Sequence, residues 1–328
     1  MTTAEKSSPL STEPIVAAAL PTNTPGNTPG NTPGSIPPAA IAWRPMSVSP
    51  PSAPRLGHEE GRTNPFASGA STSRVIGISS GKGGVGKSSV TVNLALALMG
   101  LGSTVGVLDA DVYGFSVPAM LGATGSPVVS EGSVSPVMAH GLRVISMGFF
   151  VSDDQPVIWR GPMLHKALEQ FLVDVDWGNP DFLLVDMPPG TGDVALSMSQ
   201  YLPASEVFVV TTPQLAARRV AQRSAYMARK LNLPLRGVIE NMSWMTLPDG
   251  SCQEIFGRGG GAQLAEELHV PLLGQIPLST ELREGGDSGL PVVLAAPGSE
   301  AAMAFVSIAE RVRDLGRARV VRPELRVT

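Results

Sequence analysis

The sequence lacks the features that mark secreted, disulfide-bonded and membrane-spanning proteins. Its 328 residues include a single cysteine, Cys252, so no disulfide bond can form within the chain. No apolar run approaches the roughly 18 residues that a membrane-spanning helix needs. The amino-terminal region has neither a long apolar core nor the arginines of a targeting peptide. We therefore expect a cytoplasmic protein without stable membrane insertion.

The chain also lacks a strong excess of charge of either sign. It has 24 basic and 28 acidic residues, which gives a formal net charge of −4. This near balance disfavours a protein that coats nucleic acid, so we expect no nucleic-acid partner. Hydrophobic residues make up 43% of the chain, which is enough to bury a sizeable core.

Composition changes sharply near residue 73. The stretch 23–34 repeats Asn-Thr-Pro-Gly three times, and further prolines follow up to residue 54. Proline removes backbone donors and glycine adds chain entropy, so such a stretch forms no packed element easily. We predict that residues 1–72 form a disordered arm, either a passive extension or a docking arm for a partner. Residues 73–316 are predicted to fold, and residues 317–328 to form a basic, solvated tail.

Short apolar runs alternate with helical stretches after residue 73. The runs are rich in Val, Ile and Leu, and most do not alternate with polar residues, which is typical of strands buried on both faces of a parallel sheet. The predicted strands are 74–79, 104–109, 142–147, 182–187, 206–211, 235–241 and 271–277. The predicted helices are 89–99, 162–173, 215–231, 262–268 and 302–315. This alternation predicts an α/β fold, with a doubly wound, mostly parallel sheet, helices on both faces, and a ligand site beyond the carboxyl ends of the strands.

The stretch GKGGVGKSS at 81–89 lies between a predicted strand and a predicted helix. It satisfies G-x-x-x-x-G-K-[ST], whose glycines let several backbone N–H groups point at phosphate oxygens. Lys87 should reach the β and γ phosphates of ATP, and Ser88 should ligate Mg²⁺. Further nucleotide-binding positions are predicted at Gly81, Gly83, Gly84, Val85, Gly86 and Ser89. The segment therefore predicts a P-loop ATPase domain over residues 73–316.

A second lysine, Lys82, opens the same loop. The run KGGVGKS resembles the deviant Walker A motif of the MinD, ParA and nitrogenase-iron-protein class of NTPases. The resemblance implies that Lys82 reaches across a homodimer to the partner's nucleotide. A cation placed there would stabilise the charge that develops on the γ-phosphate, as an arginine finger does. The alternative is that Lys82 is a solvated loop charge.

Two loops that carry aspartates follow buried strands. In VLDADVYG, Asp109 ends the strand and Asp111 lies in the loop, where a carboxylate can orient the attacking water. Resemblance to the same class assigns the water-orienting role to Asp111 and places Asp109 nearer the Mg²⁺ shell. In FLLVDMPPGTGD, Asp186 is predicted to hold a metal-bound water in the Walker B manner, with Gly190 or Gly192 as a hinge. The alternative is that strand-end carboxylates only cap turns.

Two further positions are assigned by resemblance to these NTPases. Asn241 ends the predicted strand at 235–241 and resembles a base-reading asparagine, because its amide can both donate to and accept from an adenine edge. Pro277 resembles a residue that packs near the base. Both would therefore bind the nucleotide.

The sequence resembles one family within this class more closely than it resembles the class as a whole. The segments GKGGVGKSSVTVNLALAL, DADVYG, WRGPM, LLVDMPPGTGD, VVTTPQ and ENMS followed by IFGRGG recur in order. Over about residues 74–300, they resemble the Mrp/ApbC family of iron–sulfur cluster carrier ATPases. The resemblance implies an ATP-hydrolysing homodimer that binds iron–sulfur clusters and transfers them to apo client proteins.

The sequence departs from the family pattern at the cluster site. Members of the family commonly carry a Cys-x-x-Cys pair between NMS and IFG, so that two protomers share one cluster. Here the segment reads NMSWMTLPDGSCQEIFG, and two protomers offer two thiolates where a cubane cluster normally has four. Cys252 is therefore either an unliganded thiol or a ligand in a two-protomer site completed by outside thiols. The LPDG stretch predicts a tight turn.

Two other functions stay open at this point. A MinD/ParA-like positioning ATPase would act on membrane or DNA, and six arginines between residues 311 and 326 could serve it. The apolar stripe at 302–315 speaks against this reading, because we expect it to pack on the sheet. A cluster-less ATPase scaffold would bind nucleotide without carrying cargo.

Overall fold

The computed structural model describes residues 63–67, 71–112, 114–130, 132–150, 161–190 and 192–318. Most of the predicted arm 1–72 and the tail from residue 319 onward lie outside the described residues. The same holds for Trp159 and Arg160 of the WRGPM segment and for Thr191 of the segment that follows Asp186.

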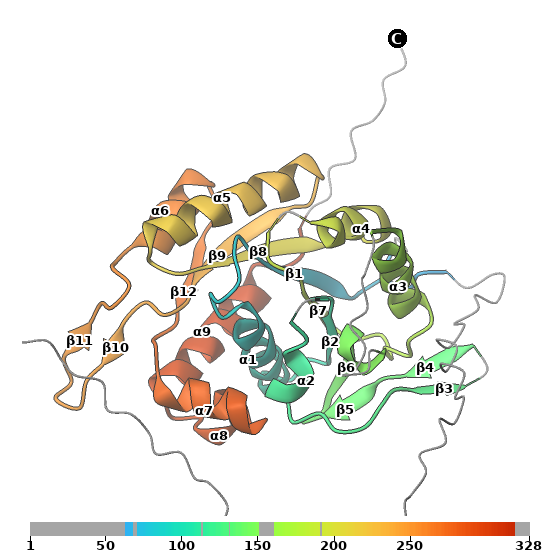
Figure 1. Ribbon diagram of the computed structural model, residues 1–328, viewed down its shortest axis with the longest axis horizontal. Helices are drawn as coiled ribbons and strands as arrows, with labels where there is room; N and C mark the ends of the chain where they lie inside the picture. Colours follow the sequence, from blue (N-terminus) through green and yellow to red (C-terminus); the bar gives the residue numbers. More distant parts are fainter. Residues whose placement is uncertain are drawn as a thin grey trace, which may run out of the picture. The chain divides into compact units, whose positions relative to one another are not determined.

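An eight-stranded sheet runs through the described domain in the order β12-β9-β8-β1-β7-β2-β6-β5 (Figure 1). Neighbouring strands are parallel, except that the edge strand β5 runs antiparallel to β6. The strands are β1 (Arg74–Ser80), β2 (Val105–Asp109), β5 (Val137–Ala139), β6 (Leu142–Ser146), β7 (Phe182–Asp186), β8 (Glu206–Thr211), β9 (Leu235–Glu240) and β12 (Leu272–Gln275). All seven predicted strands are present, and β1, β2, β7 and β8 are buried at every position.

Helices cover both faces of this sheet (Figure 1). One layer packs on a core that includes Val75, Leu183 and Val209, and consists of α3 (Gly161–Val173), α4 (Asp193–Tyr201), α5 (Leu215–Lys230) and α6 (Gly260–Glu267). The other packs on Ile76 and Leu184, and consists of α1 (Lys87–Gly100), α2 (Val117–Met120), α7 (Thr280–Ser288), α8 (Val292–Ala295) and α9 (Glu300–Asp314). Successive strand residues thus face opposite cores, as the strand period of two requires. The predicted doubly wound α/β fold is confirmed.

The last helix, α9, belongs to the core. It buries Ala302, Phe305, Ile308 and Val312, which are members of the apolar stripe that the sequence places at 302–315. The stripe is therefore engaged in packing on the sheet. Within the described residues, no helix combines the length and the apolar character of a membrane-spanning segment.

The domain also contains short secondary-structure elements that the sequence did not predict. They are the hairpin of β3 (Val128–Ser130) and β4 (Ser133–Ser135), the hairpin of β10 (Met245–Thr246) and β11 (Cys252–Gln253), the 3-10 helix Met147–Phe150, and helices α2, α4, α7 and α8. The predicted LPDG turn connects β10 and β11. Gly250 has a φ of 82°, and its N–H donates to Leu247 O at 2.9 Å.

The register of the central strands decides which side chains meet at the carboxyl edge of the sheet. Asp109 pairs with Asp186 across β2 and β7, and with Ser146 across β2 and β6. Ile78 of β1 also pairs with Asp186. Because these strands are parallel, their carboxyl ends open at one edge, where β1 leads into the loop 81–86 and α1.

Candidate nucleotide-binding site

The loop 81–86 curls closely around the amino end of α1. Gly86 has a φ of 79°, and a Cβ atom there would lie 2.2 Å from Asn241 Nδ2. A Cβ atom on Gly81 would lie 2.2 Å from the backbone N of Ala221 in α5. Both positions therefore require glycine for close backbone approach. The first N–H groups of a helix have no partner within the helix, so this loop and the start of α1 together offer donors that can hold an anion.

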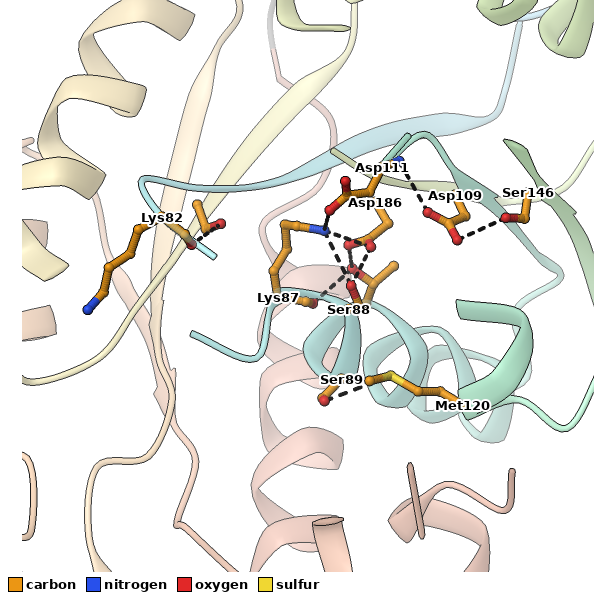
Figure 2. A network of polar contacts seen from close by, with 11 residues as sticks. Lys82, Lys87, Ser88, Ser89, Asp109, Asp111, Met120, Ser146 and Asp186 are labelled. Carbon is orange, nitrogen blue, oxygen red and sulfur yellow. Dashed lines mark hydrogen bonds and ion pairs between the residues drawn. The ribbon is translucent and has the colours of Figure 1, made fainter. Parts of the chain in front are cut away.

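A polar network surrounds Asp186 beside the loop (Figure 2). The Lys87 ammonium lies 2.7 Å from Asp186 Oδ2 and 3.5 Å from Asp111 Oδ2. Ser88 Oγ donates to Asp186 Oδ2 at 2.6 Å, and Thr91 Oγ1 donates to Asp186 Oδ1 at 2.7 Å. The Asp186 side chain is fully buried. This carboxylate is thus held by one cation and two hydroxyls on α1, a packing that fixes its direction.

The residues around Asp186 fit Mg²⁺. The Ser88 hydroxyl and the Asp186 carboxylate are hard oxygen donors, and the Lys87 ammonium between Asp186 and Asp111 shows that a cation is stabilised there. No group of three or more His, Cys, Asp or Glu side chains in the described ranges could hold a metal ion by itself. This suits Mg²⁺, which proteins usually hold by one or two side-chain oxygens together with substrate phosphates and water.

Asp109 lies next to this network and is fully buried. Its Oδ2 accepts from Ser146 Oγ at 3.0 Å, and its Oδ1 accepts from the Asp111 N–H at 3.2 Å. Burial, followed by the nearby Asp186 carboxylate, raises the pKa of Asp109 to about 8, although its hydrogen bonds act in the opposite direction. The raised pKa favours the protonated form of Asp109, which limits the negative charge of the site.

The raised pKa of Asp109 makes the stability of the domain depend on pH. Between the ordinary value of 3.8 and about 8, the unfolded chain is ionised at this position while the folded chain keeps the proton, so stability falls as pH rises. Asp109→Asn removes this titration. We expect its melting temperature without nucleotide to exceed that of the wild type by a few °C at pH 8.5, since about 1 kcal/mol corresponds to about 2–4 °C here.

Differential scanning fluorimetry from pH 5 to 8.5 checks this expectation. The exposed Asp314 offers a matched control, and Asp314→Asn should follow the wild-type curve. A constant difference between Asp109→Asn and the wild type over the whole range would contradict the raised pKa.

Lys82, the other lysine of the loop, lies in different surroundings. Its Nζ is 3.4 Å from Oε1 of Gln214, the residue that precedes α5. The side chain is half-buried and points away from the network of Lys87 and Asp186 (Figure 2). Within one chain, the two lysines therefore do not act on the same atoms in this conformation.

Two adjoining cavities extend from the loop. One, of about 400 Å³, is lined by Lys82, Lys87, Ser88, Asp111 and other residues of the loop region. The second, of about 300 Å³, shares Gly86, Ser89 and Met120 with the first, and adds Asn241, Pro277 and Arg283. The cavity at the phosphate loop thus adjoins a second cavity that contains the two residues predicted to contact the base.

Asn241 has contacts that the sequence did not suggest. Its Nδ2 donates to Val85 O at 3.0 Å, and its Oδ1 accepts from the Met242 N–H at 2.9 Å. In this conformation the amide joins the phosphate loop to the end of β9.

The sequence did not point to Thr91 and Met120 as residues of the site. Thr91 carried one usable signal, because it follows Lys87 by four residues and so lies on the same face of α1.

Cys252 lies on the hairpin of β10 and β11, which projects beyond the β12 edge of the sheet (Figure 1). The thiol is exposed and free, with Thr246 Oγ1 at 4.0 Å. Glu300 ties this hairpin to α9, because its carboxylate accepts from Trp244 Nε1 at 2.9 Å and from Thr246 Oγ1 at 2.7 Å. The structure therefore does not bring Cys252 into the nucleotide network.

Comparison with known proteins identifies relatives over this same domain. A ParA-type family model, described as the NUBPL iron-transfer P-loop NTPase, matches residues 71–313. An iron-sulfur cluster carrier protein of Mycobacterium tuberculosis is 52% identical over 252 residues, covering 75% of this chain and 66% of that protein. A protein of the same name from Escherichia coli is 48% identical over 241 residues, covering 73% and 65%. The chain thus spans just under two thirds of the length of these relatives.

Two solved structures of similar fold contain a bound nucleotide. A nucleotide-binding protein of Archaeoglobus fulgidus in complex with ADP is 32% identical, with a TM-score of 0.61, covering 71% of this chain and 91% of that chain. The septum site-determining protein MinD of Pyrococcus horikoshii, complexed with Mg-ADP, is 26% identical, with a TM-score of 0.57, covering 74% and 97%. Both similarities support the P-loop NTPase fold.

Proposed function

The chain belongs to the family of NUBPL iron-transfer P-loop NTPases, and from this premise we propose that it hydrolyses Mg·ATP and carries iron–sulfur clusters to apoproteins. The observation that carries the proposal is the network of Lys87, Ser88 and the buried Asp186 beside the phosphate loop. The curated relatives named iron-sulfur cluster carrier proteins support the cargo.

ATP binding rearranges this network. The loop N–H groups and α1 hold the phosphates, and Lys87 exchanges its contacts with Asp186 and Asp111 for the β and γ phosphates. Ser88 and Asp186 would hold Mg²⁺ with their oxygen atoms, and the ion would neutralise negative charge on the phosphates. Asp111, 7% exposed at the rim, then orients the attacking water.

If Lys82 acts on the nucleotide of a second copy, ATP hydrolysis requires a homodimer. Lys82 points away from the network of its own chain and lines the rim of the phosphate cavity. A second copy facing this rim would receive Lys82 at its γ-phosphate, where a cation lowers the barrier to phosphoryl transfer. ATP would close the pair and hydrolysis would reopen it.

The cluster is cargo that one chain cannot ligate alone. Cys252 is the sole cysteine of the sequence, and a cubane cluster normally takes four thiolates. Two copies supply two, so we propose that outside thiols complete a labile site at the exposed hairpin. A labile site suits a carrier, because the acceptor must take the cluster away.

Anaerobic reconstitution tests the cargo. Ferrous iron, sulfide and an excess of glutathione should give the full-length wild-type protein a visible cluster absorption band, which Cys252→Ser should abolish without changing ATP hydrolysis. Ser251→Ala, the neighbouring substitution in the same turn, is the matched control and should keep the band. A band of equal strength in Cys252→Ser would remove this thiol from the site, and no band in the wild type would refute the carrier function.

We place the protein in the cytoplasm, where a single exposed thiol stays reduced. The alternative of a positioning ATPase would need a free apolar stripe near the carboxyl end to bind a membrane, but the stripe of α9 is buried against the core. A cluster-less scaffold is the outcome that the reconstitution experiment separates from a carrier.

A further inference from the structure

Helix α5 lies on the outer layer of the domain (Figure 1). It presents a stripe of basic and apolar side chains to solvent. Its opposite face is buried and consists mainly of alanines. At 100° per residue, the stripe occupies an arc of about 80° and a length of about 22 Å. This α5 stripe, exposed at every position, consists of Leu215, Arg219, Arg223, Tyr226 and Lys230.

The positive charges of the α5 stripe are not compensated. The helix contains no aspartate or glutamate. Two further arginines of α5 are engaged with α6, since Arg218 pairs with Glu267 and Arg229 donates to Leu268 O. By contrast, Arg219, Arg223 and Lys230 form no ion pair within the described part of the chain. A chain with a net charge of −4 thus concentrates three exposed cations on one helix face.

The stripe exposes two large side chains with apolar surface. Tyr226 is 45% exposed and Leu215 is 52% exposed. The Tyr226 hydroxyl accepts from Gln222 Nε2 at 3.3 Å, and the same amide group donates to Glu267 at 3.1 Å. This contact restricts the rotation of the tyrosine side chain, which lowers the entropy lost when a partner binds. Arginine and tyrosine are also the side chains that protein interfaces favour.

The buried side of α5 touches the nucleotide loops. Gln214, which precedes the helix, contacts Lys82. The phosphate loop lies against the helix backbone, because a Cβ on Gly81 would stand 2.2 Å from Ala221 N. Ser224 Oγ donates to Gly190 O at 3.0 Å, in the loop that follows Asp186. A partner on the outer face of α5 would thus sit one helix away from the nucleotide.

We propose that the α5 stripe is the docking surface for an acidic segment of the apoprotein that receives the cluster. This inference rests on the proposed carrier function. Carboxylates of the acceptor would pair with Arg219 and Arg223, while an apolar side chain would pack on Tyr226 and Leu215. Complementary charge would speed the encounter and select acidic acceptors. Three cations over about 22 Å, interrupted by apolar groups, suit a protein segment better than a nucleic-acid backbone.

A charge reversal on the full-length protein tests the docking surface. The probe is an apo-ferredoxin of strongly acidic composition, and binding is measured by biolayer interferometry at two salt concentrations. Arg219→Glu/Arg223→Glu should weaken binding at least tenfold, mainly through a slower association rate. The matched control Lys166→Glu/Arg313→Glu makes the same change of charge at exposed positions on α3 and α9, and should bind within twofold of the wild type.

Cluster transfer separates this inference from the carrier function itself. The reversed variant should load a cluster and release it to a small chelator at the wild-type rate, yet transfer it slowly to apo-ferredoxin. Failure of every variant to load a cluster would refute the carrier function and leave the binding measurement valid. Equal binding of apo-ferredoxin by the reversed variant, no binding by the wild type, or binding to a single-stranded DNA oligonucleotide in preference to apo-ferredoxin would each overturn the docking surface.

Discussion

Replacing Lys87 with alanine should abolish nucleotide binding and hydrolysis together. Lys87 is buried, and its ammonium is the cation that contacts both Asp186 and Asp111. In the nucleotide complex, the proposed partner of this ammonium is the phosphate group. Truncating one member of such a buried charge pair costs about 2–5 kcal/mol of binding free energy. We therefore expect ADP and ATP affinity, measured by isothermal titration calorimetry, to fall by at least about 100-fold, with phosphate release at background.

The same substitution also destabilises the nucleotide-free protein. The experiment must therefore distinguish a loss of folding stability from a loss of nucleotide binding. Without Lys87, the fully buried Asp186 keeps only its two hydroxyl partners, and an uncompensated buried charge costs about 3–5 kcal/mol of folding free energy. Lys87→Ala combined with Asp186→Asn removes both charges and should melt closer to the wild type. A folded Lys87→Ala chain with normal turnover would contradict the assignment of the phosphate loop.

Replacing Lys82 with alanine should leave nucleotide binding almost intact and cut hydrolysis by about a thousandfold, the lower end of what an arginine finger contributes. We expect nucleotide binding to persist because, in a single chain, the Lys82 side chain contacts Gln214 and points away from the network around Asp186. If Lys82 were only a solvated loop charge, its removal would change neither nucleotide affinity nor the rate of hydrolysis. Lys166→Ala, at an exposed position on α3, is the matched control and should hydrolyse ATP at the wild-type rate.

Mixing two inactive variants tests whether Lys82 acts on a second copy. Lys82→Ala keeps its own phosphate loop, and Lys87→Ala still offers Lys82 to a partner. Mixed dimers therefore contain one complete composite site, and the mixture should recover a substantial part of the turnover that each variant has lost. Turnover that stays at background, at concentrations where sedimentation shows mixed dimers, would rule out action in trans.

The strands were predictable because a parallel sheet buries them on both faces, so that each reads as a short apolar run. Strands β1 and β7 show this pattern along their whole length. Some helices escaped prediction for an equally local reason. Helix α7 contains Gly285 and Gly286, which disfavour helix, and it forms through an N-cap in which Ser279 Oγ accepts from the Leu282 N–H. Helix α4 has only nine residues, mixes its apolar positions with serines and leaves Leu196 exposed.

The candidate site was predictable in part. The glycine-lysine spacing of the phosphate loop is contiguous in sequence, so its position was evident before any fold was known. The partners of Asp186 were harder to predict, because Ser88 is 98 positions away and the contact depends on the strand register. The raised pKa of Asp109 could not be foreseen either, since it results from burial beside another carboxylate.

The sequence by itself determined the alternation of strands and helices, the phosphate loop and the scarcity of thiols, because each is a local pattern or a count of residues. Only the tertiary structure decided that Asp109 lies beside Asp186, that Lys82 turns toward α5, and that Cys252 stands on an exposed hairpin. These placements depend on strand register and helix packing, which bring together residues that are far apart along the chain.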